Sequence, residues 1–499
     1  MANISYTRQS GSLGNWLSYH FMEKKMNTIP GYIIMLLLGS AITFAMFMTD
    51  YRIAFFVAAI VACILLVIAF LKYPYFGLYF TIAYSSIVIT LMRLVDLPFG
   101  IFVDPMTVLI LLGAVLNYDR SREINKEFWS NPVSICFYIL FAYSVVELFN
   151  PAMYSKLGWI SFFRKQVSFY IYYLSCYCLL NSKKKIIFFV NFMIGLSTLL
   201  ALYACKQQLF GYANFEMLAI MKGGPLAYQL LFQGGLLRKF STFSDPATSG
   251  IVFASSAMFC IILLVRDSNR SRKIWWAIAG TLNILGYSFS GTRTATLMIV
   301  AAIAFYSIAT LYERATLRFM FISILVFYAV LVVPSQNVVT NRIRTAFDGT
   351  RDASASLRDY DRHQIQPYLF EHPMGGGIFT SGAEGPKYNP GHPLEMFQPD
   401  SGYAKVLAEQ GAIGLALLLL TYLIVMRQGI RNFYRAKDPE IQNYYIGLLA
   451  MLFSILVGQY SQMAISQYPI LLYYYGLLVI FYKLIKYDSP QPDVEISQN

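Results

Sequence analysis

Long apolar segments alternate with short polar ones along most of the chain. A membrane-spanning helix needs roughly 20 mostly apolar residues, and fourteen segments of this sequence meet that requirement. The pattern predicts an all-α polytopic integral membrane protein with about 14 transmembrane helices (12–14, because the fourth and sixth segments are the weakest). The segments lie near residues 31–49, 53–71, 75–92, 99–117, 132–149, 165–180, 186–206, 247–265, 274–291, 293–312, 317–334, 402–426, 443–461 and 466–485.

Polar intervals divide the chain around these segments. Residues 1–30 form a polar N-terminal tail and residues 486–499 a polar C-terminal tail, so the transmembrane domain is predicted to cover 31–485. Two longer polar intervals interrupt that domain, at 207–246 and 335–400. Polar loops as long as the second are uncommon in compact proteins and are usually functional, so we expect one large working loop there.

The basic residues predict the orientation. With both termini in the cytoplasm, 22 of the 39 Lys and Arg residues lie on the inner side and 10 lie in the two long intervals, which leaves 7 for all other outer positions. Cytoplasmic loops carry an excess of Lys and Arg, whereas long loops are translocated largely regardless of charge. Both long intervals and the turn at residues 290–293 are therefore predicted to be extracytoplasmic, where ATP and nucleotide sugars are not available.

Composition supports the membrane assignment and narrows the chemistry. The chain is 57% hydrophobic and only 13% charged, and its net charge of +13 is spread over short clusters between apolar segments. That pattern is typical of membrane loops, and we expect no nucleic acid partner. The six cysteines lie in or beside apolar segments, so they indicate neither a disulfide framework nor a metal site. The histidines His363, His372 and His392 lack metal-ligand spacing, and we expect no metal and no cofactor.

Arg293 is the most specific candidate for a binding residue. It begins a predicted helix within SGTRTATLMIV, where its guanidinium and the free N–H groups of the helix would both attract an anion. Arginine suits phosphate because its planar fork donates two charge-assisted hydrogen bonds and stays protonated. The alternative is an interfacial side chain that reaches lipid headgroups, and the small neighbouring residues leave both readings open.

Three more arginines are candidates for the same anion. Arg238 precedes STFSDPATSG, where Asp245 is a plausible N-cap, although an interfacial contact with lipid phosphate explains Arg238 equally simply. Arg358 and Arg362 are four residues apart in the large loop and would share one face of a short helix. A solvated, salt-bridged helix is the alternative for that pair.

Candidate catalytic bases are also found in the large loop. His372 stands before a proline and a glycine run in EHPMGGGIF, which indicates a turn that approaches a ligand, another segment or a helix cap. His363 directly follows Arg362. Asp400 is the last polar residue but one before the twelfth apolar segment, where it would act either as an N-cap or as a general base at the membrane surface.

The order of these motifs resembles the superfamily of O-antigen polymerases and O-antigen ligases, which are bacterial inner-membrane glycosyltransferases. The resemblance extends from Leu237 to about Leu420 and depends on several short motifs in order. They are Arg238 with STFSDPATSG, the turn SGTRTA, the stretch Ser354 to Arg358 followed by the HPMGGG segment, and Asp400 and Ser401 before the Gly411 to Leu415 segment.

The resemblance implies an undecaprenyl-pyrophosphate-linked glycan as the donor, bound through its pyrophosphate by Arg293, Arg238, Arg358 and Arg362, without nucleotide or metal. An acceptor hydroxyl would attack the sugar, with Asp400, His372 or His363 as the base. The ligase motif begins with a histidine where this chain has Asp400. That departure favours a polysaccharide polymerase that makes O-antigen, capsule or exopolysaccharide.

Two other functions remain open at this stage. A ligase would move the finished glycan to lipid A core or to a protein, and a flippase or transporter would move the lipid-linked glycan without chemistry. The chain has no internal repeat of the kind found in many transporters. Expected partners are the lipid-linked glycan and membrane lipid, with a chain-length regulator or other polysaccharide assembly proteins as further candidates, and the expected location is the bacterial inner membrane.

Overall fold

The computed structural model describes residues 28–48, 51–95, 97–117, 126–233, 235–332, 344 and 353–488. Within these residues the regular elements are helices, apart from one hairpin of two-residue strands, β1 (Phe232–Gln233) and β2 (Leu236–Leu237). The predicted all-α fold is therefore confirmed. The helices of the N-terminal half are α2 (Ile29–Met48), α3 (Tyr51–Lys72), α4 (Pro74–Val95), α5 (Val103–Asn117), α6 (Lys126–Ser130), α7 (Pro132–Val146), α8 (Lys156–Leu179), α9 (Lys183–Phe210), α10 (Asn214–Lys222) and α11 (Gly224–Leu231).

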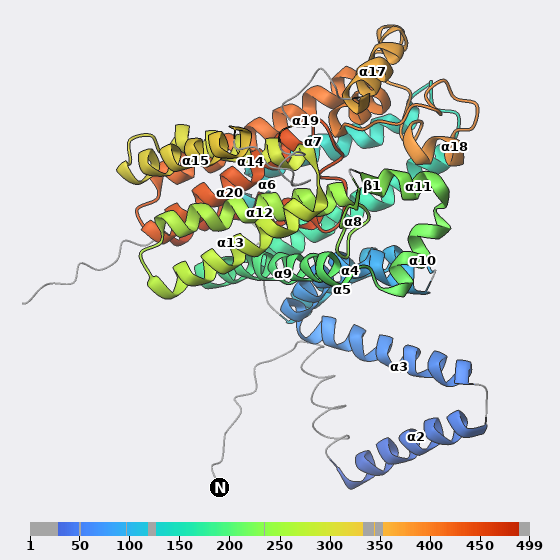
Figure 1. Ribbon diagram of the computed structural model, residues 1–499. Coiled ribbons are helices and arrows are strands. Elements are labelled where there is room, and N and C mark those ends of the chain that lie inside the picture. The colour runs from blue at the N-terminus through green and yellow to red at the C-terminus, as the bar shows by residue number, and fades with distance from the viewer. Residues whose placement is uncertain are drawn as a thin grey trace, which may run out of the picture.

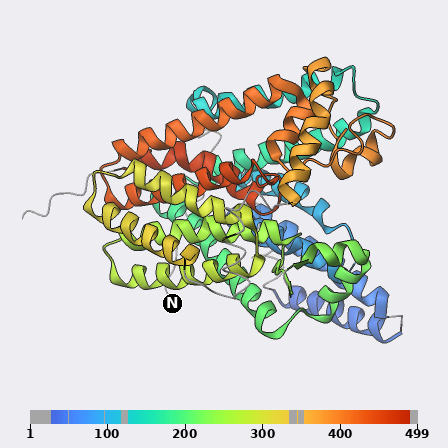
Figure 2. The same cartoon turned by 45° about the horizontal axis from the view of Figure 1, so that its top comes forward.

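The second half supplies the helices that matter for the site. They are α12 (Pro246–Arg266), α13 (Arg270–Ser290), α14 (Arg293–Ala309), α15 (Arg314–Val332), α17 (Ala353–Glu371), α18 (Gly385–Tyr388), α19 (Gly402–Arg435), α20 (Pro439–Gly458) and α21 (Ile470–Lys483). Figure 1 shows α2 and α3 at the edge of a bundle formed by the other long helices. In Figure 2 the orange segments α17 and α18 lie together at one end of the molecule.

The number of membrane-spanning helices is only partly settled. Nine helices of the described chain are long and apolar enough to cross a membrane. They confirm a multi-pass membrane protein, while the count of fourteen spans stays a prediction. The fourth predicted segment is among the nine as Phe99–Asn117, and its Asp104 forms an ion pair with Arg164.

The interior of the bundle is formed by α12, α20 and α21. Most side chains of α12 are buried, including small ones such as Ser249 and Gly250. A helix that is buried on every side is expected to be apolar on every side. By contrast, almost nothing of α15 is buried inside the protein. The apolar side chains of α15 are therefore left for membrane lipid or another protein.

Charged side chains at one end of the bundle pair across helices. Arg266 Nη1 lies 2.6 Å from Glu313 Oε2, and Lys183 Nζ lies 2.5 Å from Asp438 Oδ2. These residues belong to the segments that the basic-residue pattern assigns to the cytoplasmic side. Arg293 stands at the other end of α14, so the candidate arginines lie away from these ion pairs.

Three differences from the sequence-based prediction bear on the site. Segment 443–461 was expected to be helical throughout, but α20 ends at Gly458 and residues 459–462 form a turn. The interval 335–400 is not a plain loop in its described part, because α17 and α18 form within it. Likewise the interval 207–246 contains α10, α11 and the hairpin. Apolar counting misses these features because it registers neither helices in polar segments nor the end of a helix at a glycine.

Candidate functional site

The turn between α13 and α14 holds Arg293 at the start of a helix. Gly291 adopts a left-handed conformation (φ 59°) that ends α13, and only glycine enters that region without cost. Thr292 is the N-cap of α14, yet its side chain makes no capping hydrogen bond. Its hydroxyl instead donates to the carbonyl oxygen of Pro246 (2.8 Å), which ties the turn to the start of α12.

Arg238 is anchored on this same turn. Its Nε donates to the carbonyl oxygen of Ser290 (2.9 Å) and its Nη2 donates to Thr292 Oγ1 (3.0 Å). The next residue, Lys239, donates its backbone N–H to the carbonyl oxygen of Phe289 (3.0 Å). The segment before α12 therefore runs along the turn, and Arg238 lies beside the residue that precedes Arg293.

Lys239 points to a different partner. Its ammonium lies 4.8 Å from the centre of the Tyr212 ring, which in turn stacks on Phe240. Burial lowers the pKa of the Lys239 ammonium, although the nearby Glu216 carboxylate acts in the opposite direction. We therefore separate Lys239 from the arginine site.

A short turn after α20 connects the remaining site residues. Ser461 Oγ lies 2.7 Å from Thr294 Oγ1, one residue beyond Arg293. Tyr460 accepts two hydrogen bonds from Arg362 of α17, from Nη1 to its hydroxyl (3.0 Å) and from Nη2 to its carbonyl oxygen (3.1 Å). The turn at 459–462 thus joins α14 to α17.

The same turn also contacts the start of α19. Ser401 Oγ and the backbone N–H of Gly402 both donate to the carbonyl oxygen of Gln459, at 3.2 and 3.0 Å. Asp400, directly before Ser401, is exposed. The N-cap role considered for Asp400 belongs to Ser401, whose Oγ accepts from the backbone N–H of Ala404 (3.3 Å), so the Asp400 carboxylate is not needed as the cap.

Three of the four candidate arginines therefore converge on one end of the bundle. Arg238, Arg293 and Arg362 are linked through the turns at 290–292 and 459–462, and Asp400 stands next to the second turn. Arg358 lies one helical turn before Arg362 on α17, but its side chain is outside the described part of the chain. The sequence reasoning missed Tyr460 and Ser461. The polar run in the apolar stretch around GQYSQ, where α20 ends, was the available signal.

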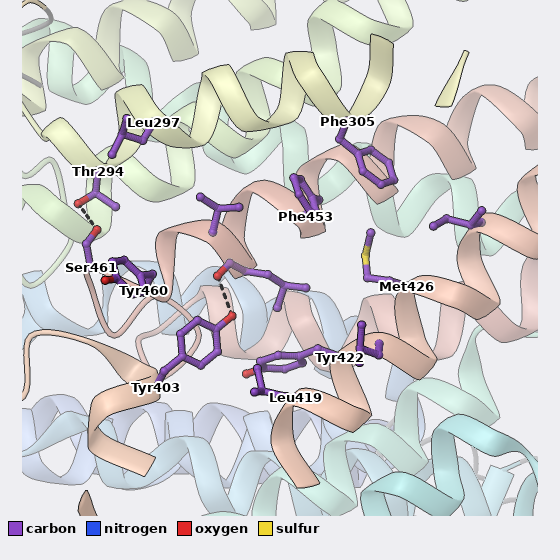
Figure 3. A pocket seen from close by; sticks show the side chains of 14 residues that line it. Thr294, Leu297, Phe305, Tyr403, Leu419, Tyr422, Met426, Phe453, Tyr460 and Ser461 are labelled. Carbon is purple, nitrogen blue, oxygen red and sulfur yellow. Dashed lines mark hydrogen bonds between the residues drawn. The ribbon is translucent and has the colours of Figure 1, made fainter. Parts of the chain in front are cut away.

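An apolar groove begins at this site. It has a volume of about 740 Å³ and runs between α14, α19 and α20. Figure 3 shows Thr294, Tyr460 and Ser461 at one part of the groove and Phe305 and Met426 at another. Leu297 and Leu423 on its walls are exposed (40% and 67%), so the groove opens to the surface of the bundle where lipid would lie. The full lining is Thr294, Leu297, Phe305, Tyr403, Leu419, Tyr422, Leu423, Met426, Ile430, Phe453, Leu456, Val457, Tyr460 and Ser461.

The glycine run after His372 has another role in the structure. Helix α19 is kinked at Gly411, whose φ of 69° and ψ of −170° are not helical. A kink removes helical hydrogen bonds, and the freed backbone groups must find other partners. The backbone N–H groups of Gly376 and Gly377 donate to the carbonyl oxygens of Ala408 and Glu409 (2.8 and 2.9 Å).

Two further hydrogen bonds satisfy backbone groups beside the kink. The backbone N–H of Ala412 donates to the carbonyl oxygen of Pro373 (3.0 Å). The hydroxyl of Tyr143 on α7 donates to the carbonyl oxygen of Gln410 (2.7 Å). We call residues 373–377 the glycine clasp. Of the three readings of this turn, the approach to another chain segment is the one observed.

The three histidines of the large loop lie on or near α17. His372 Nδ1 is 3.1 Å from the carbonyl oxygen of Tyr368, and the two rings stack with centres 4.2 Å apart. His392 is buried and its Nδ1 accepts from the backbone N–H of Leu394 (3.0 Å). Burial lowers the pKa of His392, which favours a neutral ring. His363 is exposed on α17 next to Arg362.

No group of three His, Cys, Asp or Glu side chains in the described parts of the chain is arranged to hold a metal ion. The charged groups of the site are arginines and one exposed carboxylate. Such a set can bind an anion and accept a proton, and its position at the end of an apolar groove suits an amphipathic anion.

The fold and site define a multi-pass helical membrane protein with a cationic cluster at one end. Residues 278–419 match the family model described as O-antigen ligase. This match supports an O-antigen polymerase- or ligase-like family, and it confirms the resemblance inferred from the motifs. The matched segment includes Arg293, Arg362, His372 and Asp400, whereas Arg238 and Tyr460 lie outside it. No curated protein matches the chain. The family indicates glycosyltransferase-like activity.

Proposed function

We propose that the protein is a polysaccharide polymerase that joins undecaprenyl-pyrophosphate-linked repeat units at the extracytoplasmic face of the bacterial inner membrane. The observation that carries this proposal is the convergence of Arg238, Arg293 and Arg362 at the end of an apolar groove. A lipid-linked glycan has two parts that match this site, an anionic pyrophosphate for the arginines and a long apolar chain for the groove.

The arginines would act on the leaving group. In the reaction, a hydroxyl oxygen of the acceptor sugar forms a bond to the anomeric carbon of the donor sugar, and the bond between that carbon and the pyrophosphate oxygen breaks. Negative charge then develops on the pyrophosphate, and fixed cationic donors stabilise it without reorganising. The acceptor proton passes to a carboxylate, for which Asp400 is the candidate because it is exposed beside the arginine cluster.

The groove would orient the lipid rather than supply binding energy. A prenyl chain in the bilayer is already surrounded by apolar tails, so its transfer to an apolar groove yields little hydrophobic gain. Affinity would then come mainly from the pyrophosphate and the arginines. The groove between α14 and α19 would direct the chain so that the sugar projects toward Asp400.

A ligase remains the second candidate because the matching family model is described as O-antigen ligase. A ligase would share the donor site and differ in its acceptor. The aspartate at position 400, where the ligase motif has a histidine, supports the polymerase. A chain-length regulator is a further proposed partner under the polymerase reading.

The test is Arg293→Ala in the host cell, with polymer, protein level and lipid-linked intermediates measured together. Loss of one preorganised donor lowers such rates by about 10²–10³, so polymer disappears while single-repeat intermediates accumulate. Arg270→Ala is the matched control, because Arg270 also begins a helix but is exposed at the opposite end of the bundle. Normal polymer from Arg293→Ala at normal protein level would refute the proposal. Full-length polymer that stays on the lipid carrier when the gene is deleted would indicate the ligase.

A further inference from the structure

Tyr460 occupies the border between the arginine cluster and the groove. It lies in the turn after α20 and contributes to the lining of the groove near Thr294 (Figure 3). The residue is 61% exposed. A side chain so exposed contributes little to core packing, and its contacts must be explained in another way.

Those contacts hold the guanidinium of Arg362 at three points. The two hydrogen bonds come from separate nitrogens, and the guanidinium carbon also lies 4.7 Å from the centre of the Tyr460 ring. That distance is within the range of a cation–π contact. An arginine side chain has about 2 kcal/mol of rotamer entropy, and fixing it before a ligand arrives removes that cost from binding.

The remaining donors of Arg362 are available for an anion. A guanidinium has five N–H groups, and two of them are directed to Tyr460. Among the described side chains no other hydrogen bond of Arg362 is formed, which leaves three donors for a ligand at the groove entrance. Because the hydroxyl and the carbonyl of Tyr460 hold Arg362 while its ring belongs to the groove wall, one residue contacts both the cationic and the apolar part of the site.

We propose that Tyr460 is a positioning residue that holds Arg362 for the pyrophosphate of a lipid-linked glycan and covers the prenyl carbons next to that pyrophosphate. The proposal rests on the proposed function for the identity of the ligand. It assigns to Tyr460 an effect on ligand affinity that is transmitted through Arg362.

The direct test measures binding of undecaprenyl pyrophosphate to the full chain in nanodiscs. Tyr460→Phe keeps the ring and the carbonyl but removes one acceptor, and we expect its Kd to rise about fivefold. Tyr460→Leu also removes the cation–π contact and should raise the Kd about 30-fold. Tyr434→Phe is the matched control, since Tyr434 is an exposed tyrosine whose hydroxyl donates to the carbonyl oxygen of Ala309, the last residue of α14.

A double-mutant cycle separates positioning from general damage. In an Arg362→Gln background, Tyr460→Phe should have no further effect on Kd, because its contribution passes through the missing guanidinium. The thermal stability of Tyr460→Phe should equal that of the wild type. An unchanged Kd in Tyr460→Phe and Tyr460→Leu, or an equal loss with and without Arg362, would overturn the proposal.

The cycle also distinguishes this proposal from the polymerase assignment. If the coupled effect on Kd is found but the purified protein forms no polymer from lipid-linked repeats, Tyr460 has the proposed role and the polymerase assignment fails. If polymer forms and the Tyr460 variants keep the wild-type Kd and KM, the assignment stands and the role of Tyr460 is refuted. When turnover is measured, KM should rise and kcat should fall, because Arg362 both binds the pyrophosphate and stabilises the charge that develops on it as the bond breaks.

Discussion

Gly411→Ala tests whether the glycine clasp and the kink of α19 form one unit. The φ and ψ of Gly411 belong to a region that only glycine occupies readily, and other residues there cost about 1–3 kcal/mol. An added Cβ would also lie 2.1 Å from the carbonyl oxygen of Pro373 and 2.7 Å from the backbone nitrogen of Gly375. Both are backbone atoms, so the clasp itself must move.

The expected loss of stability follows from these two terms. Displacing the clasp breaks the hydrogen bonds from Gly376 and Gly377, each with a net contribution of about 0.5–1.5 kcal/mol. Together with the backbone strain, Gly411→Ala should destabilise the protein by about 2–6 kcal/mol. Gly195→Ala is the control, because an added Cβ meets nothing within 4 Å in α9 and alanine is the better helix former.

The assay is thermal unfolding of the purified protein in one detergent at one scan rate, since unfolding of such proteins is often irreversible. Gly375→Ala, whose Cβ would lie 2.6 Å from the Gly411 nitrogen, should also lower the apparent Tm. The variant that carries both substitutions should lose less apparent Tm than the two single variants added together, because both substitutions disrupt the same contact. Wild-type stability in Gly411→Ala, or additive losses in the double variant, would refute the reasoning.

Two further predictions concern charged groups. Arg238→Lys should reduce polymer formation at least about tenfold, since one ammonium cannot reproduce the two-point attachment to Ser290 and Thr292; wild-type yield at equal protein level would contradict this. Burial would raise the pKa of Asp438, but hydrogen bonds from Lys183 and the backbone outweigh it and hold that pKa below its usual range. Asp438→Asn keeps the cap of α20 and should cost about 1–2 kcal/mol at pH 7. Because the folded-state pKa is lowered, the difference in unfolding free energy between the wild type and Asp438→Asn should shrink as the pH falls below about 4. A difference that does not depend on pH would exclude the charge as its cause.

The apolar pattern predicts the helices well because a spanning helix is defined by length and composition, both of which are visible in a sequence. Each of the fourteen predicted segments overlaps a helix of the structure, from α2 to α21. Asp245 was also correctly identified as an N-cap, since its Oδ1 accepts from the backbone N–H of Thr248 (2.9 Å). Local chemistry within four residues decides such a feature, and the sequence contains all of it.

The contacts between distant segments could not be predicted in this way. Arg238 and Thr292 are 54 residues apart, and Arg362 and Tyr460 are 98 apart. Periodicity and spacing carry no information about which turns meet at the end of a bundle. Tyr460 could not be identified for a second reason. Hydropathy counting placed it inside a spanning helix that in fact ends at Gly458.

The role of the glycine run also required the structure. From the sequence, HPMGGG indicates only a close approach of backbone to something. The partner became visible through the kink at Gly411, which exposes carbonyl oxygens that Gly376 and Gly377 satisfy. A kink without proline leaves little trace in a helical pattern, since Gly411 is followed by an ordinary apolar run.

The central claim is tested most directly by incubating the purified protein in nanodiscs with undecaprenyl-pyrophosphate-linked repeat units of its host, without nucleotide, and separating the products by size. The account predicts a ladder of lengthening glycans on the lipid carrier, absent with Arg293→Ala and present with Arg270→Ala. Substrate that is bound but unchanged in length would contradict a polymerase, and transfer that begins only when a second acceptor is added would establish a ligase in its place.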